Sequence, residues 1–498
     1  MTDDQMRERA ARDLAEYRAK AGEGALSPEQ AGALAWRAAE RYLANPLPGE
    51  AAPRDAIRLL CEMTASGDSA IARQGVRALF GGLIERLNDS FEPAACDVYD
   101  RLFIQVIDFY RRRPGAEPFD EALRGFGLAN EADLLARKAR RGGGAEGMSA
   151  LPGSIRKVLF PSRVTIGADV ALTSVLMAKL REALPEAEFV FLGSPKLREL
   201  YGGDARIRVR SLGYERGGAV MSRLMSWVDL VEAVREEARG MPAAELLIID
   251  PDSRLTQLGL LPLVEGDRGC HHFESRAYRH PGAKQLGHLA SRWLEERFGL
   301  AGEAFPFLAL PPEHARFGRR LSESLRGGGA LHLTTISFGV GGNEEKRISA
   351  AFEQELIENR LAGGSTLLLD KGASPDERRQ IDAILEMVRA RGRTVVEVTP
   401  QSAAEWMRRD AIHADVLTWD GGIGEFAGLI AAGDRYIGYD SAGQHLAAAL
   451  RVPTLTLFVN ASSATFAERW RPYGSGRISV AGFRPDNLPA SPQEIEEL

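Results

Sequence analysis

Apolar residues recur three or four positions apart through the N-terminal part of the chain. From Ser27 onward this pattern runs through SPEQAGALAWRAAERYLA, DAIRLLCEMTASG, QGVRALFGGLIERLND and DVYDRLFIQVIDFYRRR. Such spacing places the apolar side chains along one face of an α-helix. Ser27 also precedes a proline and, three residues further on, Gln30, which predicts a capped helix start. The pattern predicts an all-helical N-terminal domain over residues 1–140.

The pattern changes after a glycine-rich stretch. Residues 141–154 include a proline and lack periodicity, which is typical of a flexible linker. Beyond them short apolar runs alternate with amphipathic stretches, in one series that begins at KVLF and a second that begins at LHLTTISFG. Alternation of this kind predicts parallel sheets covered by helices. We therefore expect two Rossmann-like α/β domains, over residues 155–318 and 319–498, that face each other across a ligand cleft.

Composition narrows the class of protein. Hydrophobic residues make up 44% and charged residues 27% of the chain, as in soluble globular proteins. No run of about 20 apolar residues could span a bilayer, and the charged N-terminus lacks the apolar core of a secretory signal. We therefore expect a cytoplasmic protein without a transmembrane segment, and peripheral attachment to the inner membrane stays open. The net charge of -6 gives no overall electrostatic attraction to nucleic acid.

Cysteine and histidine residues offer little support for a metal site. The three cysteines contain no CxxC pair. Cys270-His271-His272 and His280 have a spacing found among metal ligands, but adjacent histidines point in different directions and no carboxylate cluster completes the set. We expect no bound metal and no cofactor.

The best candidate for chemistry is the turn after the predicted strand DRYIGY. Asp440, Ser441, Ala442 and Gly443 form this turn, and a helix of small residues begins near Gln444. Small residues let backbone amides approach a diphosphate, and a helix N-terminus contributes about half a positive charge. An aspartate N-cap before a tightly packed helix accounts for the same residues without a ligand.

The letters of this turn resemble the D-[ST]-G-x-x-H-L-A-A-A-L signature of the family 9 glycosyltransferases, which include the ADP-heptose:lipopolysaccharide heptosyltransferases. Asp440, Ser441 and His445 match, whereas Ala442 stands where the family usually has glycine and Gly443 follows it. The resemblance implies a GT-B fold and a nucleotide-diphosphate sugar as the donor substrate. It implies that the donor is bound by Asp440, Ser441, Ala442, Gly443, Gln444 and His445.

Two further segments of the second domain resemble the family. Family members have a small-residue loop after the first strand and then a lysine that meets the donor phosphates, and this implies donor-binding roles for Gly339, Gly341, Gly342 and Lys346. A solvated helix start is the alternative for the lysine. Glu425, in GGIGEFAGLIAAGD, stands where such folds meet the donor's ribose or sugar hydroxyls.

The first domain carries the candidate base. Gly167, Asp169 and Thr173 resemble the family's G-D-V-x-x-T turn, with Ala168 inserted after the glycine. The resemblance implies that Asp169 is the catalytic base and that Gly167 and Thr173 lie on the acceptor side. From the residues alone, an aspartate in the first turn of a helix is also a favourable partner for the helix dipole. Asp252 follows a buried strand, where ligands bind in such sheets, and is a further acceptor-side candidate.

These features predict a metal-independent inverting glycosyltransferase that moves a sugar from a nucleotide-diphosphate sugar to a hydroxyl of a glycan, a lipid-linked saccharide or a protein. In that hypothesis Asp169 accepts the acceptor's proton, and Lys346 with the amides of the 440–445 turn stabilises the leaving diphosphate. Two alternatives stay open. One is a nucleotide-sugar epimerase on the same scaffold, and the other is a non-catalytic binding or scaffolding protein whose helical domain recruits a protein partner.

Overall fold

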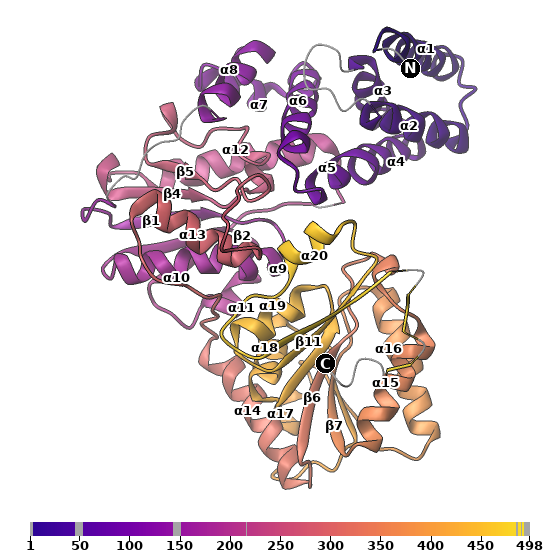
Figure 1. The fold of residues 1–498 in the computed structure, drawn as a ribbon, viewed down its shortest axis with the longest axis vertical. Helices are drawn as coiled ribbons and strands as arrows, with labels where there is room; N and C mark the ends of the chain where they lie inside the picture. Colours follow the sequence, from indigo (N-terminus) through magenta and orange to yellow (C-terminus); the bar gives the residue numbers. More distant parts are fainter. Residues whose placement is uncertain are drawn as a thin grey trace. The chain divides into compact units, whose positions relative to one another are not determined.

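The chain divides into two compact units, which are described separately below. Figure 1 labels their helices and strands. The computed structural model describes residues 3–44, 53–142, 151–215, 217–484, 487–489 and 491–492. The first unit comprises Met1–Gly147 and Leu212–Tyr278, and the second comprises Met148–Ser211 and Arg279–Leu498. The predicted domain boundaries at residues 140, 154 and 318 stay a prediction, and residues 143–150 of the predicted linker lie outside the described residues.

The N-terminal part of the first unit is helical, as predicted. Ser27 Oγ accepts a hydrogen bond from the Gln30 amide, and the Ser27 amide donates to the Gln30 side chain, so the predicted capping box is present. The helices are α1 (Asp3–Gly22), α2 (Pro28–Leu43), α3 (Arg54–Thr64), α4 (Ser69–Arg77), the π-helix η1 (Ala78–Ile84), α5 (Glu85–Asp89), α6 (Pro93–Tyr110), α7 (Glu117–Gly125) and α8 (Glu131–Gly142).

The later segment of the first unit packs against these helices. It contains α12 (Val220–Glu237) and two parallel strands, β4 (Leu246–Asp250) and β5 (Cys270–His272), with 3₁₀ turns at η3 (Ala243–Glu245), η4 (Arg254–Thr256) and η5 (Glu265–Asp267). The Trp227 ring meets Phe119 edge to face at 5.6 Å, and the Arg223 guanidinium lies 3.6 Å from the Phe80 ring centre. Arg137 donates to the carbonyl of Gly259 at 2.7 Å. The sequence predicts this segment as part of the first α/β domain, and the structure adds its packing on the helices.

The second unit begins with three parallel strands. These are β1 (Lys157–Pro161), β2 (Glu188–Gly193) and β3 (Ile207–Ser211), with β2 paired to both of the others. The helical pieces that follow β1 are α9 (Ile166–Ala168), the π-helix η2 (Asp169–Thr173) and α10 (Ser174–Ala183); α11 (Leu197–Tyr201) follows β2 and α13 (Leu286–Phe298) comes later in the chain. The apolar run Val158, Leu159 and Phe160 in β1 is fully buried, as expected for a strand covered on both faces.

A seven-stranded parallel sheet forms the rest of the second unit, in the order β12-β11-β10-β6-β7-β9-β8. Its strands are β6 (His332–Ser337), β7 (Ser365–Asp370), β8 (Val395–Val398), β9 (Val416–Trp419), β10 (Arg435–Tyr439), β11 (Thr454–Val459) and β12 (Ile478–Phe483). Its helices are α14 (Pro312–Gly327), the 3₁₀ turn η6 (Glu344–Lys346), α15 (Ala350–Ala362), α16 (Pro375–Ala390), α17 (Ala403–Trp406), α18 (Ile423–Ala432), α19 (Ala442–Ala449) and α20 (Ala464–Trp470). Strand β6 lies between β7 and β10, with β7, β8 and β9 on one side of it and β10, β11 and β12 on the other. The strand order therefore reverses between β6 and β10, where open α/β sheets bind their ligands.

Glycines allow α14 and α18 to cross in backbone contact. A methyl group on Gly318 would overlap the carbonyl of Gly428, and one on Gly428 would overlap the carbonyl of His314. Because neither position tolerates a side chain without a shift of backbone, the crossing fixes α18 and the start of that helix.

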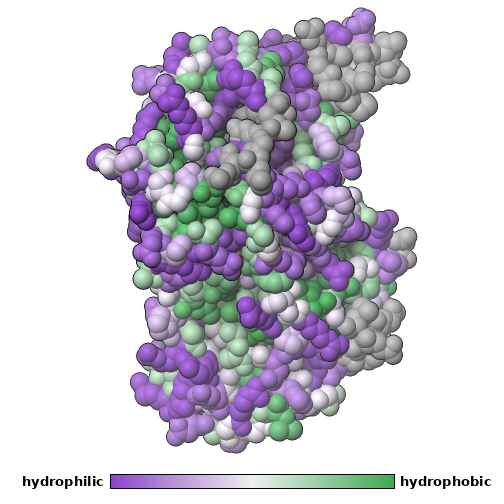
Figure 2. All heavy atoms as spheres, turned by 60° about the vertical axis from the view of Figure 1, so that its left-hand side comes forward, coloured by the Kyte–Doolittle hydropathy of each residue, from purple (hydrophilic) through white to green (hydrophobic). Residues whose placement is uncertain are grey.

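The surface is mostly hydrophilic on the face drawn in Figure 2, with apolar side chains gathered in several smaller patches. Among the described residues the large exposed hydrophobic side chains are Trp36, Leu331 and Leu488. No helix in the described part of the chain has the length and apolar character that a membrane span requires.

Candidate functional site

The predicted donor turn lies at the point where the strand order reverses. Asp440 and Ser441 directly follow β10, and Ser337 ends the neighbouring strand β6. Ser441 is the N-cap of α19 with an extended backbone, and its side chain caps none of the helix amides. First-turn amides of a helix lack partners inside the helix and attract anions. The geometry therefore offers an anion-binding helix start at the carboxyl edge of the sheet.

Lys346 reaches this turn from η6. Its Nζ donates to Asp440 Oδ2 at 2.7 Å, and the side-chain amide of Gln444 donates to Asp440 Oδ1 at 2.7 Å. The Lys346 side chain is 26% exposed and its Nζ lies 5.5 Å from the centre of the Phe466 ring. Three of the predicted donor residues are thus brought together, and the lysine stays accessible to an anion.

The turn after β1 abuts the same helix start. A methyl group on Gly167 would lie 3.1 Å from Ala442 Cα and 3.4 Å from His445 Cδ2. His445 is 5% exposed, and burial lowers its pKa to about 4, so its ring is neutral near pH 7. The predicted acceptor-side glycine therefore lies against two of the predicted donor residues.

Gly443 has a packing role that the sequence did not predict. A methyl group on it would overlap the hydroxyl of Tyr436 and lie 2.8 Å from that ring's Cζ. Gly438, in β10, faces the same hydroxyl, because a methyl group there would lie 2.9 Å from Cζ. Besides the predicted approach of a diphosphate, Gly443 is needed to admit this phenol beneath the turn.

The glycine loop after β6 adopts the backbone that its residues favour. Gly341 has φ 63° and Gly342 has φ 83°, values in the left-handed region that other residues avoid. Both glycines are exposed, whereas Gly339 borders the carboxylate of Glu377. Glu377 accepts a hydrogen bond from the Val340 amide at 3.1 Å, which anchors the loop to the start of α16.

Sequence reasoning missed a half-buried carboxylate beside this loop. Asp370 ends β7 and accepts hydrogen bonds from Ser337 Oγ at 3.0 Å and from the Gly372 amide at 3.1 Å. Burial raises its pKa to about 6. The signal in the sequence was a charged residue directly after the apolar run TLLL and two positions before Gly372.

An open hollow of about 560 Å³ lies at the carboxyl ends of β11 and β12. It borders η6, and its lining residues are Glu345, Asn460, Ala461, Ser462 and Arg484. Asn460 donates from its side chain to the Glu345 carbonyl at 2.7 Å. The hollow therefore adjoins the loop that carries Lys346, and its lining offers hydrogen-bonding groups of several kinds.

Asp169 is buried and fully hydrogen-bonded within its own turn. It is 1% exposed and accepts from the hydroxyl of Ser162, from the amide of Arg163 at 2.8 Å and from the hydroxyl of Thr173 at 3.1 Å. Burial raises its pKa to about 6 despite these donors. This proton affinity suits a general base, although the three donors also give the carboxylate a structural role.

Glu425 lies in the first turn of α18, beside His314. Its Oε1 is 3.2 Å from His314 Nδ1. The neighbouring amide of Gly424 donates to Glu199 at 3.0 Å. A role of Glu425 toward a donor stays a prediction.

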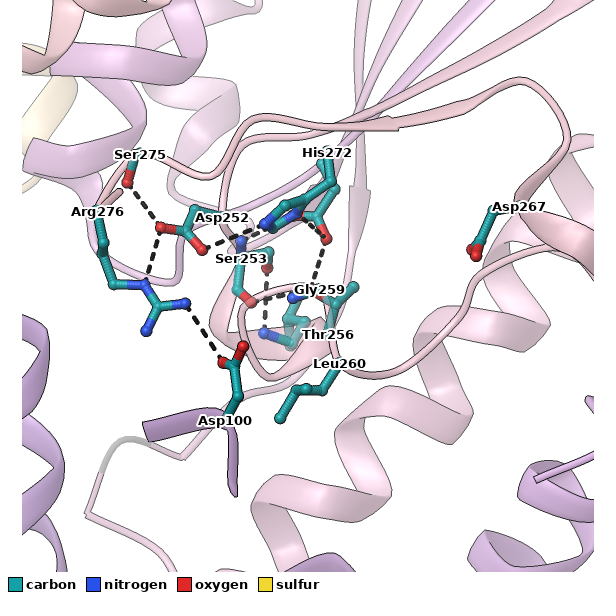
Figure 3. A network of polar contacts seen from close by, with 12 residues as sticks. Asp100, Asp252, Ser253, Thr256, Gly259, Leu260, Asp267, His272, Ser275 and Arg276 are labelled. Carbon is teal, nitrogen blue, oxygen red and sulfur yellow. Dashed lines mark hydrogen bonds and ion pairs between the residues drawn. The ribbon is translucent and has the colours of Figure 1, made fainter. Parts of the chain in front are cut away.

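Asp252 belongs to a buried polar network of the first unit (Figure 3). It is 1% exposed, and its Oδ2 accepts from Ser275 Oγ at 2.8 Å and from Arg276 Nε at 3.3 Å. His272 lies beside it, with Nε2 3.6 Å from Asp252 Oδ1 and Nδ1 3.3 Å from Asp250 Oδ2. Asp252 also has a left-handed backbone with φ 67°, so this contact set holds it in a conformation that non-glycine residues rarely adopt. Its predicted acceptor-side role stays a prediction.

The described ranges contain no set of side chains arranged to bind a metal ion. No three of their histidine, cysteine and carboxylate side chains form a group that could hold a metal ion. His271 and His272 are consecutive in β5, so their side chains point to opposite faces of the sheet. Independence from metal and from cofactors stays a prediction.

Comparison with known proteins finds a resemblance to one family over the segment that contains the turn at Asp440. The model of glycosyltransferase family 9 (heptosyltransferase) matches residues 382–489, a range that contains β8 to β12 and the turn at Asp440. A search of curated proteins found no match. The predicted resemblance to family 9 is therefore confirmed over this range, and it supports glycosyltransferase activity.

Several solved structures are similar to the chain. A family 9 glycosyl transferase from Veillonella parvula is 16% identical, with 67% of this chain and 87% of that one covered and a TM-score of 0.46. The E. coli heptosyltransferase WaaC with ADP is 15% identical, with coverage of 68% and 98% and a TM-score of 0.47. The E. coli ADP-heptose lps heptosyltransferase II is 15% identical, with coverage of 68% and 96% and a TM-score of 0.45. The parallel sheets and the helical N-terminal segment described above confirm the predicted fold class, an α/β fold behind helices.

Proposed function

We propose that the chain is an inverting glycosyltransferase that moves a sugar from a nucleotide-diphosphate sugar to an acceptor hydroxyl. The observation that carries this proposal is the convergence of Lys346 and the uncapped start of α19 at the reversal of strand order. A cation and a helix N-terminus at this edge of an α/β sheet form a site for phosphate groups.

The donor diphosphate would compete with Asp440 for the Lys346 ammonium. Lys346 is partly exposed and flexible, so it can turn from the carboxylate to a phosphate oxygen. As the bond between the anomeric carbon and the diphosphate oxygen breaks, negative charge grows on that oxygen. Lys346 and the first amides of α19 would stabilise this charge in the transition state. The neighbouring hollow beside Glu345 offers space for another part of the donor.

Asp169 would act as the general base. The acceptor oxygen attacks the anomeric carbon from the face opposite the leaving diphosphate, which inverts the configuration, and its proton passes to the carboxylate. A pKa near 6 leaves Asp169 mostly ionised at pH 7 and still basic enough to take a proton. Because three donors surround this carboxylate, an acceptor hydroxyl must displace one of them, and the Ser162 and Thr173 hydroxyls can rotate away.

The acceptor is proposed to be a glycan, a lipid-linked saccharide or a protein. Gly167 and Thr173 flank Asp169 and would lie on the acceptor side. The helices of the first unit are candidates for contact with a protein partner, and this role stays a prediction.

Calorimetric titration with ADP, GDP and UDP tests the donor site directly. We expect at least one nucleotide to bind, and at 100 times its dissociation constant it should stabilise the protein by about 2.7 kcal/mol. Binding of none of the three would contradict the proposal and favour a scaffolding protein. Incubation with the corresponding sugar nucleotides, without an acceptor, distinguishes the epimerase, because only an epimerase would convert the sugar under those conditions.

A further inference from the structure

The phenol of Tyr436 is buried directly beneath the start of α19. Tyr436 is 0% exposed, and two glycines, Gly438 and Gly443, leave the space that its hydroxyl occupies. A glycine in the first turn of a helix and another inside a strand each weaken the local structure. The fold therefore gives up local stability at two positions to bring one hydroxyl to this turn.

The Tyr436 hydroxyl has no hydrogen-bond partner in the structure. A buried hydroxyl without a partner destabilises the folded state, so its retention calls for an explanation. The hydroxyls of Ser441 and Ser337 lie close enough to influence the phenol: burial and the Asp370 carboxylate raise the pKa of Tyr436, and the two serines oppose that rise. The hydroxyls of Ser441 and Ser337 are thus candidates to accept a hydrogen bond from Tyr436.

The existing hydrogen bonds favour one of these serines. Ser337 Oγ already donates to Asp370 at 3.0 Å and accepts from the Gly339 amide at 3.4 Å. Ser441 Oγ caps no amide of α19. A serine hydroxyl has one proton and two acceptor positions. If Tyr436 donates to Ser441, the Ser441 proton cannot point back at the phenol and is directed elsewhere.

We propose that Tyr436 is a positioning residue of the anion site: its hydroxyl donates to Ser441 Oγ when a diphosphate occupies the start of α19, and the Ser441 hydroxyl then donates to that diphosphate. This inference rests on the proposed donor site. It explains why a phenol, which reaches no ligand itself, lies under the turn. It also explains why Gly443 is required in addition to the small residue Ala442.

The test is nucleotide binding by Tyr436→Phe in the full chain, measured by calorimetry with whichever of ADP, GDP and UDP binds the wild type most tightly. We expect affinity to fall about 3- to 10-fold, since a hydrogen bond to a charged group is weakened and not removed. Because the variant loses a buried hydroxyl without a partner, its Tm without nucleotide should be unchanged or higher. A purely structural tyrosine predicts no change in affinity.

A matched control removes a different buried hydroxyl from the same sheet. Thr418 lies in β9, is 0% exposed, and its Oγ1 also lacks a hydrogen-bond partner. Thr418→Val should leave nucleotide affinity unchanged while it affects Tm in the same direction as Tyr436→Phe. An equal loss of affinity in both variants would overturn the inference.

A double-mutant cycle with Ser441→Ala tests the route of the effect. If Tyr436 acts through Ser441, Tyr436→Phe should cause no further loss of affinity once Ser441 is alanine. Additive losses would overturn the inference and leave the donor site intact. If the wild type binds none of the three nucleotides, the proposed function fails first, and the inference fails with it.

Discussion

Two aspartates of the second unit follow parallel strands and precede helices, yet their surroundings differ. The Asp169 carboxylate is 1% exposed and accepts its hydrogen bonds from the hydroxyls of Ser162 and Thr173 and the amide of Arg163, close to it in the sequence. Asp440 is held by Lys346, which lies 94 positions away in the sequence, and by Gln444 from α19. The first environment raises the pKa of a carboxyl, and the second pairs a carboxylate with a cation that a ligand can take over. Similar local sequence patterns can therefore give one carboxyl a raised pKa and pair another carboxylate with a partly exposed cation.

The sharpest test of this comparison is Asp169→Asn, which keeps the shape of the side chain and removes its charge. We expect the rate of sugar transfer to fall by at least about 100-fold, the lower end of the contribution of a general base, with nucleotide affinity nearly unchanged. Steady-state kinetics and calorimetry measure the two effects. Asp434→Asn is the control, because Asp434 accepts the Leu333 amide at the amino edge of the sheet. Retention of more than about a tenth of the activity would show that Asp169 is not the base.

Lys346→Ala tests the surroundings of Asp440, because it removes the cation that pairs with that carboxylate. We expect nucleotide binding to weaken by about 1.5 to 3 kcal/mol, the typical worth of a hydrogen bond to a charged group. Lys371→Ala is a matched control, since Lys371, like Lys346, is paired with carboxylates, in its case two at 2.6 Å and 3.0 Å, but it follows β7. Unchanged affinity after Lys346→Ala would remove the lysine from the site.

Gly443→Ala and Ala442→Gly compare the two small residues of the donor turn. The methyl group at residue 443 would meet the Tyr436 ring, so we expect a loss of about 1 to 3 kcal/mol in the free energy of unfolding, as for an overpacked core. Ala442→Gly should cost no more than about 1 kcal/mol, the difference in helix propensity. Denaturant titration measures both. Equal losses would argue against the packing of Tyr436 as the reason for Gly443.

The dependence of stability on pH tests the raised pKa of Asp169 without an assay of activity. Burial raises the pKa of Asp169 from its ordinary 3.8 to about 6, so between these values the folded state holds a proton that the unfolded state has released. The free energy of unfolding therefore falls as pH rises through this window, by at most about 1.4 kcal/mol for each unit of pKa difference. Asp169→Asn should show a shallower fall between pH 4 and 6, and a slope equal to that of the wild type would contradict the raised pKa. Burial also raises the pKa of Asp370 to about 6, so part of the fall in the free energy of unfolding should remain in both proteins.

The rate of sugar transfer by the wild type should increase as pH rises through about 6, because the base must lose its proton.

Much of the fold could be predicted because its signals are local. The capping box at Ser27, the helical periodicity of the N-terminal segment and the alternation of strands and helices all depend on residues near one another in the sequence. The family resemblance of the turn at Asp440 could be recognised for the same reason, since Asp440 to His445 are consecutive.

Contacts between distant segments could not be predicted in this way. The packing of Trp227 on Phe119 leaves no trace in either local pattern, because each residue is only one more buried aromatic. The same holds for Tyr436 and Gly443. The strand pattern predicts that Tyr436 is buried, but it does not predict that the hydroxyl lies against Gly443. Asp370 was missed because its proximity to Ser337 depends on the pairing of β6 with β7.

The close approach of Gly167 to Ala442 has a consequence for motion in the second unit. A methyl group on Gly167 would lie 3.1 Å from Ala442 Cα, so the turn after β1 and the start of α19 would have to separate by a few tenths of an ångström to accept it. We expect the two segments to move apart or rotate about this contact more readily than to approach each other. A substitution that adds more bulk at Gly167 should therefore push the segments apart.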